Sequence, residues 1–225
     1  MSAEQRVPKP RAARILIVDD HPMMREGLSV RISAQADMSV CGEADDVDEA
    51  LRQVRDVCPD LVIVDLSLRR GHGLDLIERI KASHPAVKML VVSQFEESLY
   101  ALPSLRAGAM GYINKQQCQE NVVQAIRVVL LGGRYLSPEM TSHLVARAIE
   151  GGVPSETDPV ERLSNRELEV FQLIGQGATT SSVARQLHVS IHTIESHREK
   201  LRHKLGLKNG AELTRYAIHW VLQKG

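Results

Sequence analysis

The sequence is poor in aromatic residues, in cysteine and in long apolar runs. These shortages limit, in turn, the make-up of the core, the role of the cysteines and the chance of a membrane helix. Phe, Trp and Tyr make up 3% of the 225 residues while 43% are hydrophobic, so the core must be mostly aliphatic. The three cysteines, Cys41, Cys58 and Cys118, are widely spaced and odd in number, and they show no metal-ligand pattern. We expect them to be small buried hydrophobes in a reducing cytosol.

No apolar run approaches the roughly 20 residues that a membrane helix needs. The first ten residues also lack the apolar core of a signal peptide, so we expect a cytoplasmic protein without membrane contact. The formal net charge is zero, but residues 1–150 hold 18 Lys and Arg against 20 Asp and Glu, whereas residues 160–225 hold 10 against 6. A mildly basic C-terminal part behind an acidic larger part fits nucleic-acid binding.

Short apolar runs alternate with segments of helical period from Arg14 to about residue 131. The runs, which we predict to be strands, are Ile15–Val18, Met38–Cys41, Leu61–Val64, Met89–Val92 and Gly111–Ile113. This alternation is typical of a parallel sheet covered on both faces. Residues 14–131 are therefore predicted to form an α/β doubly wound, flavodoxin-like domain with five parallel strands, behind a disordered tail over residues 1–13.

Glycines and prolines interrupt the pattern over residues 132–160, which we predict to be a linker with room for one helix at Thr141–Glu150. The strand signal then disappears. Ser164-Asn-Arg-Glu167 is a capping box that opens a helix. Helical stretches follow at Ser182–Leu187, at Ile191–Leu205 and after Asn209. Residues 161–225 are therefore predicted to form a small all-α domain of four helices.

Three aspartates fall where predicted strands end. Asp19 and Asp20 end the first strand, and Asp65 ends the third. Reactive groups of an open α/β sheet collect outside these strand ends, at the topological switch point. If the first and third strands are neighbours, three carboxylates converge, which is unfavourable unless a hard cation binds them. Mg²⁺ suits such a site because it accepts a few carboxylates and keeps several waters.

Two further polar residues belong to the same edge. Ser93 ends the fourth predicted strand, and Lys115 follows the fifth. A carboxylate, a metal ion, a hydroxyl group and an ammonium group together form a phosphoryl-transfer site, in which Asp65 attacks in line. An aspartate at a strand end is often only a cap or turn residue. Five residues of suitable types at the strand ends are harder to assign to chance.

These residues resemble the receiver domain of response regulators. The matching motifs are Asp19-Asp20-His21-Pro22, Arg25-Glu-Gly27, Asp65 with Gly73-Leu74, Ser93, and Gly108-Ala-Met-Gly-Tyr-Ile-Asn-Lys115. The resemblance implies that a sensor histidine kinase phosphorylates Asp65. It also implies that Asp20, Asp65 and the Ser67 carbonyl bind Mg²⁺ directly, with Asp19 acting through water. Ser93 and Tyr112 resemble the family's switch pair, while Arg69 stands where many relatives have proline.

The two central stretches of the C-terminal part are separated by His188-Val189-Ser190, a tight turn with Ser190 placed as an N-cap. Ile194, Leu201 and Leu205 share one face of the second helix and should be buried. The opposite face is polar and carries His192, Glu195, Ser196, Glu199 and Arg202. Such a face is most often simply solvated, but it is also the natural candidate for the major groove of DNA.

This part resembles a LuxR-type helix-turn-helix through Leu163-Ser, Arg166-Glu167, Val183-Ala184, Thr193-Ile194, His197-Arg198 and Lys204-Leu205-Gly206. With the receiver in front, the chain resembles the NarL/FixJ response regulators. The resemblance implies a transcription regulator and not an enzyme, apart from phosphoryl uptake and slow autodephosphorylation. Active relatives bind promoter DNA as homodimers, and their receiver can cover the recognition helix until it is phosphorylated.

We expect the DNA contacts to come from one set of residues. These are Thr179, Thr180, Ser181, His192, Thr193, Glu195, Ser196, Arg198, Glu199, Lys200 and Arg202. Glu195 and Ser196 should help to read bases, because a carboxylate can accept a hydrogen bond from cytosine N4. Arg198, Lys200, Arg202 and residues 179–181 should anchor phosphates.

Other functions compete with this hypothesis. A Mg²⁺ phosphatase of the haloacid-dehalogenase type needs a second Asp two residues after the nucleophile, where this chain has Ser67. A module whose C-terminal domain binds a protein instead of DNA stays open, because Glu195 and Glu199 make the groove face acidic. A regulator that is no longer phosphorylated is disfavoured by the complete set of acidic, hydroxyl and lysine residues.

Overall fold

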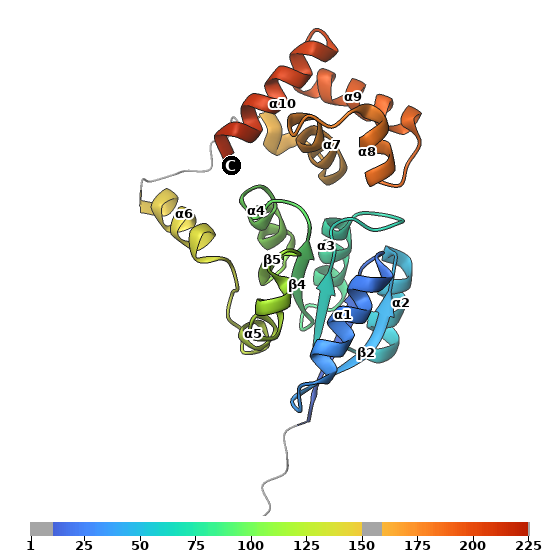
Figure 1. The fold of residues 1–225 in the computed structure, drawn as a ribbon, viewed down its shortest axis with the longest axis vertical. Helices are drawn as coiled ribbons and strands as arrows, with labels where there is room; N and C mark the ends of the chain where they lie inside the picture. The colour runs from blue at the N-terminus through green and yellow to red at the C-terminus, as the bar shows by residue number, and fades with distance from the viewer. Residues whose placement is uncertain (1–10, 150–158, 225) are drawn as a thin grey trace, which may run out of the picture.

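The computed structural model describes residues 11–149 and 159–224. Its N-terminal part is a five-stranded parallel sheet in the order β2-β1-β3-β4-β5, with helices on both faces (Figure 1). The elements are β1 (Ala13–Val18), α1 (Pro22–Ser33), β2 (Met38–Ala44), α2 (Val47–Val57), β3 (Leu61–Val64), α3 (Gly73–Ser83), β4 (Lys88–Ser93), α4 (Glu97–Ala107), β5 (Gly111–Asn114) and α5 (Cys118–Leu130). The predicted doubly wound α/β fold is confirmed.

Alternate residues of each strand point to opposite faces of the sheet, and both faces are covered. On β1, Ile15 and Ile17 pack in a cluster with α1 and α5, whereas Leu16 and Val18 pack with α2, α3 and α4. All four residues are completely buried. A strand buried on both faces needs apolar residues throughout, which is why these strands read as continuous apolar runs.

The C-terminal part is helical. Its elements are α6 (Pro138–Ile149), the 3₁₀ helix η1 (Pro159–Arg162), α7 (Asn165–Gly175), α8 (Thr180–Gln186), α9 (Ile191–Lys204) and α10 (Gly210–Lys224). The predicted capping box opens α7, with the Ser164 and Glu167 side chains each accepting from the other's backbone N–H. On α9, Ile194 and Leu201 are completely buried and Leu205 is half-buried. The four helices α7–α10 form the small all-α unit that was predicted.

The proposed tail and linker are described only in part. Residues 1–10 and 150–158 lie outside the described residues, and β1 begins at Ala13. Within the predicted linker, α6 begins at Pro138, three residues before the helix expected there. Over the described ranges, no helix is both long enough and apolar enough to cross a membrane.

The prediction of buried cysteines is wrong for Cys58. All three cysteines are free, but Cys118 is buried, Cys41 is half-buried and Cys58 is exposed. Cys58 is the C-cap of α2 and has a left-handed backbone conformation with φ of 44°. Because the helix ends at the protein surface there, its side chain has no core to enter.

The helical unit α7–α10 lies next to the part of the N-terminal domain that carries α3 and α4 (Figure 1). Asn165 Nδ2 at the start of α7 donates to Asp75 Oδ1 on α3, at 2.9 Å. A cavity of about 280 Å³ lies between the two parts, lined among others by Leu102 of α4, Leu168 of α7 and Trp220 of α10. The two parts therefore meet through both polar and apolar groups.

Candidate phosphoryl-transfer site and nucleic-acid interface

The register of the sheet brings the polar strand ends together. Val18 of β1 pairs with Val64 of β3, and the Asp65 N–H donates to the Val18 carbonyl at 2.8 Å. Asp19 and Asp65 therefore leave two neighbouring strands at the same level. On the other side of β3, the Lys115 N–H donates to the carbonyl of Ser93, at 2.7 Å. The pairing and register of the strands thus place all these residues on one edge of the sheet.

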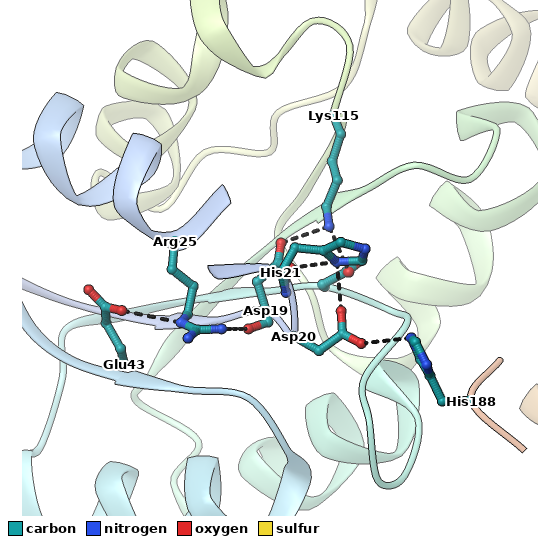
Figure 2. Close-up of polar contacts among 8 residues, drawn as sticks. Asp19, Asp20, His21, Arg25, Glu43, Lys115 and His188 are labelled. Carbon is teal, nitrogen blue, oxygen red and sulfur yellow. Dashed lines mark hydrogen bonds and ion pairs between the residues drawn. The ribbon is translucent and has the colours of Figure 1, made fainter. Parts of the chain in front are cut away.

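The acidic pocket is buried and carries a lysine. Lys115 Nζ lies 2.7 Å from Asp19 Oδ2 (Figure 2). It also lies 2.8 Å from Asp65 Oδ2. Burial raises the pKa of Asp65 to about 6; the Lys115 cation opposes this rise and the Asp19 anion adds to it. Burial alone would lower the pKa of Lys115, but the Asp65 and Asp19 carboxylates raise it above its ordinary value. The pocket therefore holds more negative charge than Lys115 alone compensates.

The donor set fits a divalent cation. One ligand atom from each of Asp19, Asp20, His21 and Asp65 lies within 4.8 Å of the others. Asp65 Oδ1 is buried, and within the described ranges nothing forms a hydrogen bond with it. Carboxylate oxygens are the ligands that Mg²⁺ prefers. His21 Nδ1 lies 2.6 Å from Asp20 Oδ1, so in this structure the histidine contacts one of the carboxylates.

The loop after Asp65 is closed by its own backbone. Ser67, the third expected metal ligand through its carbonyl, is 6% exposed and forms an isolated antiparallel bridge with His72. His72 caps α3, its Nδ1 accepting from the Leu74 N–H at 3.1 Å. Arg69, which stands where many receiver domains have proline, lies 3.3 Å from Asp45 in a largely exposed ion pair. The loop therefore has backbone, cap and side-chain contacts of its own without the proline.

The two residues expected to act as a switch are both buried. Ser93 Oγ has no hydrogen-bond partner of normal geometry in the described part of the chain. Tyr112 is 1% exposed, and its hydroxyl donates to the Phe95 carbonyl at 3.0 Å. The aromatic side chain is therefore turned inward in this structure.

The helix-turn-helix is formed by α8 and α9. Its N-caps are Thr179, which accepts from the Ser182 N–H, and Ser190, which accepts from the Thr193 N–H at 3.1 Å. Of the residues expected to contact DNA, six are exposed (Thr179, Ser181, His192, Glu195, Glu199 and Lys200) and five are half-buried (Thr180, Thr193, Ser196, Arg198 and Arg202). The N-terminal domain therefore leaves this face accessible.

One of these residues is already hydrogen-bonded within its own domain, and another is half-buried. The Ser196 hydroxyl donates to the His192 carbonyl at 3.1 Å, so it must rotate before it can reach a base. Burial, with a smaller effect of the neighbouring Arg202 charge, lowers the pKa of Arg198. Arg198 therefore lies closer to the core than the exposed Lys200.

Three residues near the acidic pocket were not predicted as site residues. Arg25 Nη1 donates to the Asp19 carbonyl at 2.7 Å, and its Nε lies 3.2 Å from Glu43. His21 and Arg25 lie within the motif that carries the receiver resemblance, which is the signal that points to them. His188 comes from the helix-turn-helix turn, and its Nε2 lies 3.3 Å from Asp20 Oδ2 (Figure 2). No sequence pattern points to that contact.

An acidic pocket at the carboxyl edge of a parallel sheet, followed by a helix-turn-helix unit, defines a receiver domain joined to a DNA-binding domain. The family model of the response regulator receiver domain matches residues 15–127, and that of the bacterial regulatory proteins of the luxR family matches residues 161–217. The chain belongs to the NarL/FixJ family of two-component response regulators.

Individual relatives agree with this assignment. The chain is 37% identical over 209 residues to the oxygen regulatory protein NreC of Staphylococcus carnosus (strain TM300), covering 91% of this chain and 96% of the relative. A LuxR-family response regulator from Aurantimonas sp. SI85-9A1 is 35% identical, with a TM-score of 0.57, over 61% of this chain and 99% of that one. RcsB from Salmonella enterica serovar Typhimurium, solved bound to the promoter rprA, is 26% identical, with a TM-score of 0.60, over 92% and 98%.

The protein is therefore a DNA-binding response regulator of a two-component system. The match to the luxR family favours DNA over a protein as the partner of the C-terminal domain.

Proposed function

We propose that Asp65 accepts a phosphoryl group from a sensor histidine kinase, and that this modification switches dimerisation and promoter binding. The observation that carries the proposal is the buried Asp65 carboxylate, which has Lys115 Nζ 2.8 Å from Oδ2 and leaves Oδ1 without a hydrogen-bond partner in the described residues. The similar RcsB was solved on a promoter in the presence of phosphomimetic BeF3-.

In this proposal an Asp65 carboxylate oxygen attacks the phosphorus of a phosphohistidine. The P–O bond forms as the P–N bond breaks, and the departing imidazole nitrogen takes up a proton from water. A carboxyl group with a pKa of about 6 is mostly ionised at neutral pH, so Asp65 is available as the nucleophile. Slow loss of the group follows when water attacks the phosphorus: the bond between phosphorus and the Asp65 oxygen breaks, inorganic phosphate leaves and the carboxylate is restored.

The surrounding residues have separate tasks. Lys115 offers its ammonium group to the phosphoryl oxygens. Ser93 offers a hydroxyl that, among the described residues, forms no hydrogen bond of normal geometry with another group. Asp19, Asp20, Asp65 and the Ser67 carbonyl would hold Mg²⁺, which supplies positive charge for the transferred group. Tyr112 is proposed to hold the inward position that goes with the Ser93 contact.

The free energy expected from contacts to a phosphoryl group is comparable with what a two-state switch requires. Moving a two-state equilibrium from 1:99 to 99:1 needs about 5.5 kcal/mol of differential stabilisation. Hydrogen bonds to charged groups contribute about 1.5–3 kcal/mol each. Contacts from Ser93 and Lys115 to a phosphoryl group therefore supply a large part of the required difference.

The DNA interface in this proposal is the exposed face of α9 together with the start of α8. Glu195 and Ser196 would reach base edges, whereas Arg198, Lys200, Arg202 and residues 179–181 would contact phosphates. Two copies would bind as a homodimer. This is supported by a solved structure of two RcsB dimers bound to two parallel DNAs, from a protein 25% identical to this chain.

The test compares the wild-type protein with Asp65→Asn in the presence of Mg²⁺ and acetyl phosphate. The wild type should gain a phosphoryl group in its intact mass, shift toward the dimer in light scattering and bind its DNA more tightly. Asp65→Asn should do none of these. Identical behaviour of the two proteins would remove the switch from the proposal.

A further inference from the structure

The turn between α8 and α9 reaches the acidic pocket of the receiver. His188 Nε2 lies 3.3 Å from Asp20 Oδ2 (Figure 2), and the side chain of His188 is 51% exposed while that of Asp20 is 3% exposed. Asp20 is one of the carboxylates proposed to hold Mg²⁺. The DNA-binding domain therefore touches the proposed metal site itself, through a residue that the phosphorylation chemistry does not use.

A second set of contacts fixes the position of this turn. The Leu187 carbonyl, directly before His188, accepts from Arg166 Nη2 at 2.8 Å. Arg166 Nη1 donates to Glu169 Oε2 at 2.6 Å, and the same oxygen lies 3.4 Å from His72 Nε2 of the receiver. Glu169 is completely buried and His72 is 2% exposed. The turn is therefore connected through α7 to the loop that follows Asp65.

We infer that docking of the DNA-binding domain and metal binding at Asp20 oppose each other through His188. This inference rests on the proposed metal site. The negative charge of Asp20 attracts His188 whether the imidazole is protonated or is a neutral N–H donor. A dication bound to the same carboxylate compensates the negative charge that attracts His188. Mg²⁺ also needs room for several bound waters. Both effects weaken the contact, so the sign of the coupling is the same in either protonation state.

Thermodynamic linkage makes this coupling reciprocal: a docked domain weakens metal binding by the same factor by which the metal weakens docking. The face of α9 expected to meet DNA remains accessible in the docked arrangement. The coupling therefore sets where the DNA-binding domain is held, and it does not depend on burying the recognition helix. Binding of Mg²⁺ at the phosphorylation site would then begin to release the DNA-binding domain from the receiver before any phosphoryl group is transferred.

The experiment measures Mn²⁺ binding to the full chain through the electron paramagnetic resonance signal of the free ion, with Mg²⁺ as competitor. His188→Gly removes the imidazole and suits the left-handed backbone at this position, where φ is 51°. His188→Asn keeps a side chain that tolerates this conformation. Both variants should bind Mn²⁺ about two- to fivefold more tightly than the wild type, which is the range of a partly exposed ion pair. His203→Ala, an exposed histidine on α9, should bind like the wild type.

The possible outcomes separate this inference from the proposed function. Equal affinity of wild type and both His188 variants would overturn the inference while leaving the metal site in place, and weaker binding by the variants would overturn its sign. If the wild type binds no Mn²⁺, the metal site itself is wrong and the inference is lost with it. Small-angle X-ray scattering gives a second readout: Mg²⁺ should enlarge the radius of gyration of the wild type, and the His188 variants should already be larger without it.

Discussion

Replacing Asp65 with asparagine should make the metal-free protein more stable, and the gain should increase with pH. The side chains have almost the same shape, but asparagine carries no charge in a pocket that Asp19 and Asp20 share. Burial, opposed by Lys115 and reinforced by Asp19, raises the pKa of Asp65 from 3.8 to about 6. The folded protein therefore binds this proton more strongly than the unfolded chain does.

The sign follows from that difference. The stability associated with protonated Asp65 is fully present below the unfolded pKa of 3.8 and is lost as the pH rises through the folded pKa of about 6. A shift of about two pKa units corresponds to about 3 kcal/mol. Asp65→Asn escapes this loss, so its advantage should approach about 3 kcal/mol at pH 8 and be about half as large at pH 5.

Urea unfolding followed by circular dichroism, at both pH values and with a chelator present, measures these free energies. The matched control is Asp56→Asn, an exposed aspartate near the end of α2, which should change stability little at either pH. Added Mg²⁺ should stabilise the wild type and narrow the gap. An Asp65→Asn protein no more stable than wild type at pH 8, or a gain independent of pH, would refute the electrostatic account of the pocket.

Two further predictions concern the DNA face and the loop after the site. Glu195→Ala should change the base preference found by binding-site selection, whereas Lys200→Ala should weaken binding to all sequences and lower the slope of log affinity against log salt by about one; an unchanged preference for Glu195→Ala would show that Glu195 does not read bases. Gly73→Ala would place a Cβ 2.2 Å from the Asp65 carbonyl oxygen, so it should destabilise the fold by about 1–3 kcal/mol and slow phosphorylation, and an unaltered urea midpoint would contradict that contact.

The strands and their acidic ends were predictable because the information is local. Four-residue apolar runs such as Leu61–Val64 are long enough to identify a buried strand, and the residue that ends each run must lie at the sheet edge. That β1 and β3 are neighbours was a condition of the prediction, and the strand order of the sheet meets it. Asp19, Asp65, Ser93 and Lys115 could therefore be placed on one edge before their distances were known.

Contacts between distant segments could not be predicted in this way. Nothing in the residues around His188 indicates Asp20 as its neighbour, because that contact depends on how two separately folded parts pack. The exposure of Cys58 follows from the point where α2 ends, and helix ends are set within one or two residues by competing caps. The rotamer of Ser196 depends on whether its hydroxyl finds the His192 carbonyl or another partner.

Trp220 lies at the cavity between the two domains, where its fluorescence can report their separation. It is the only tryptophan of the chain, it is 9% exposed, and its ring meets Phe171 edge-on with centroids 5.7 Å apart. The Trp220 side chain also lines the cavity between the two domains, together with Leu102 of α4. If the domains part, water reaches this indole while its packing on Phe171 is kept. The protein thus contains its own optical probe, whose emission reports domain separation during kinase assays or DNA titrations without any added label.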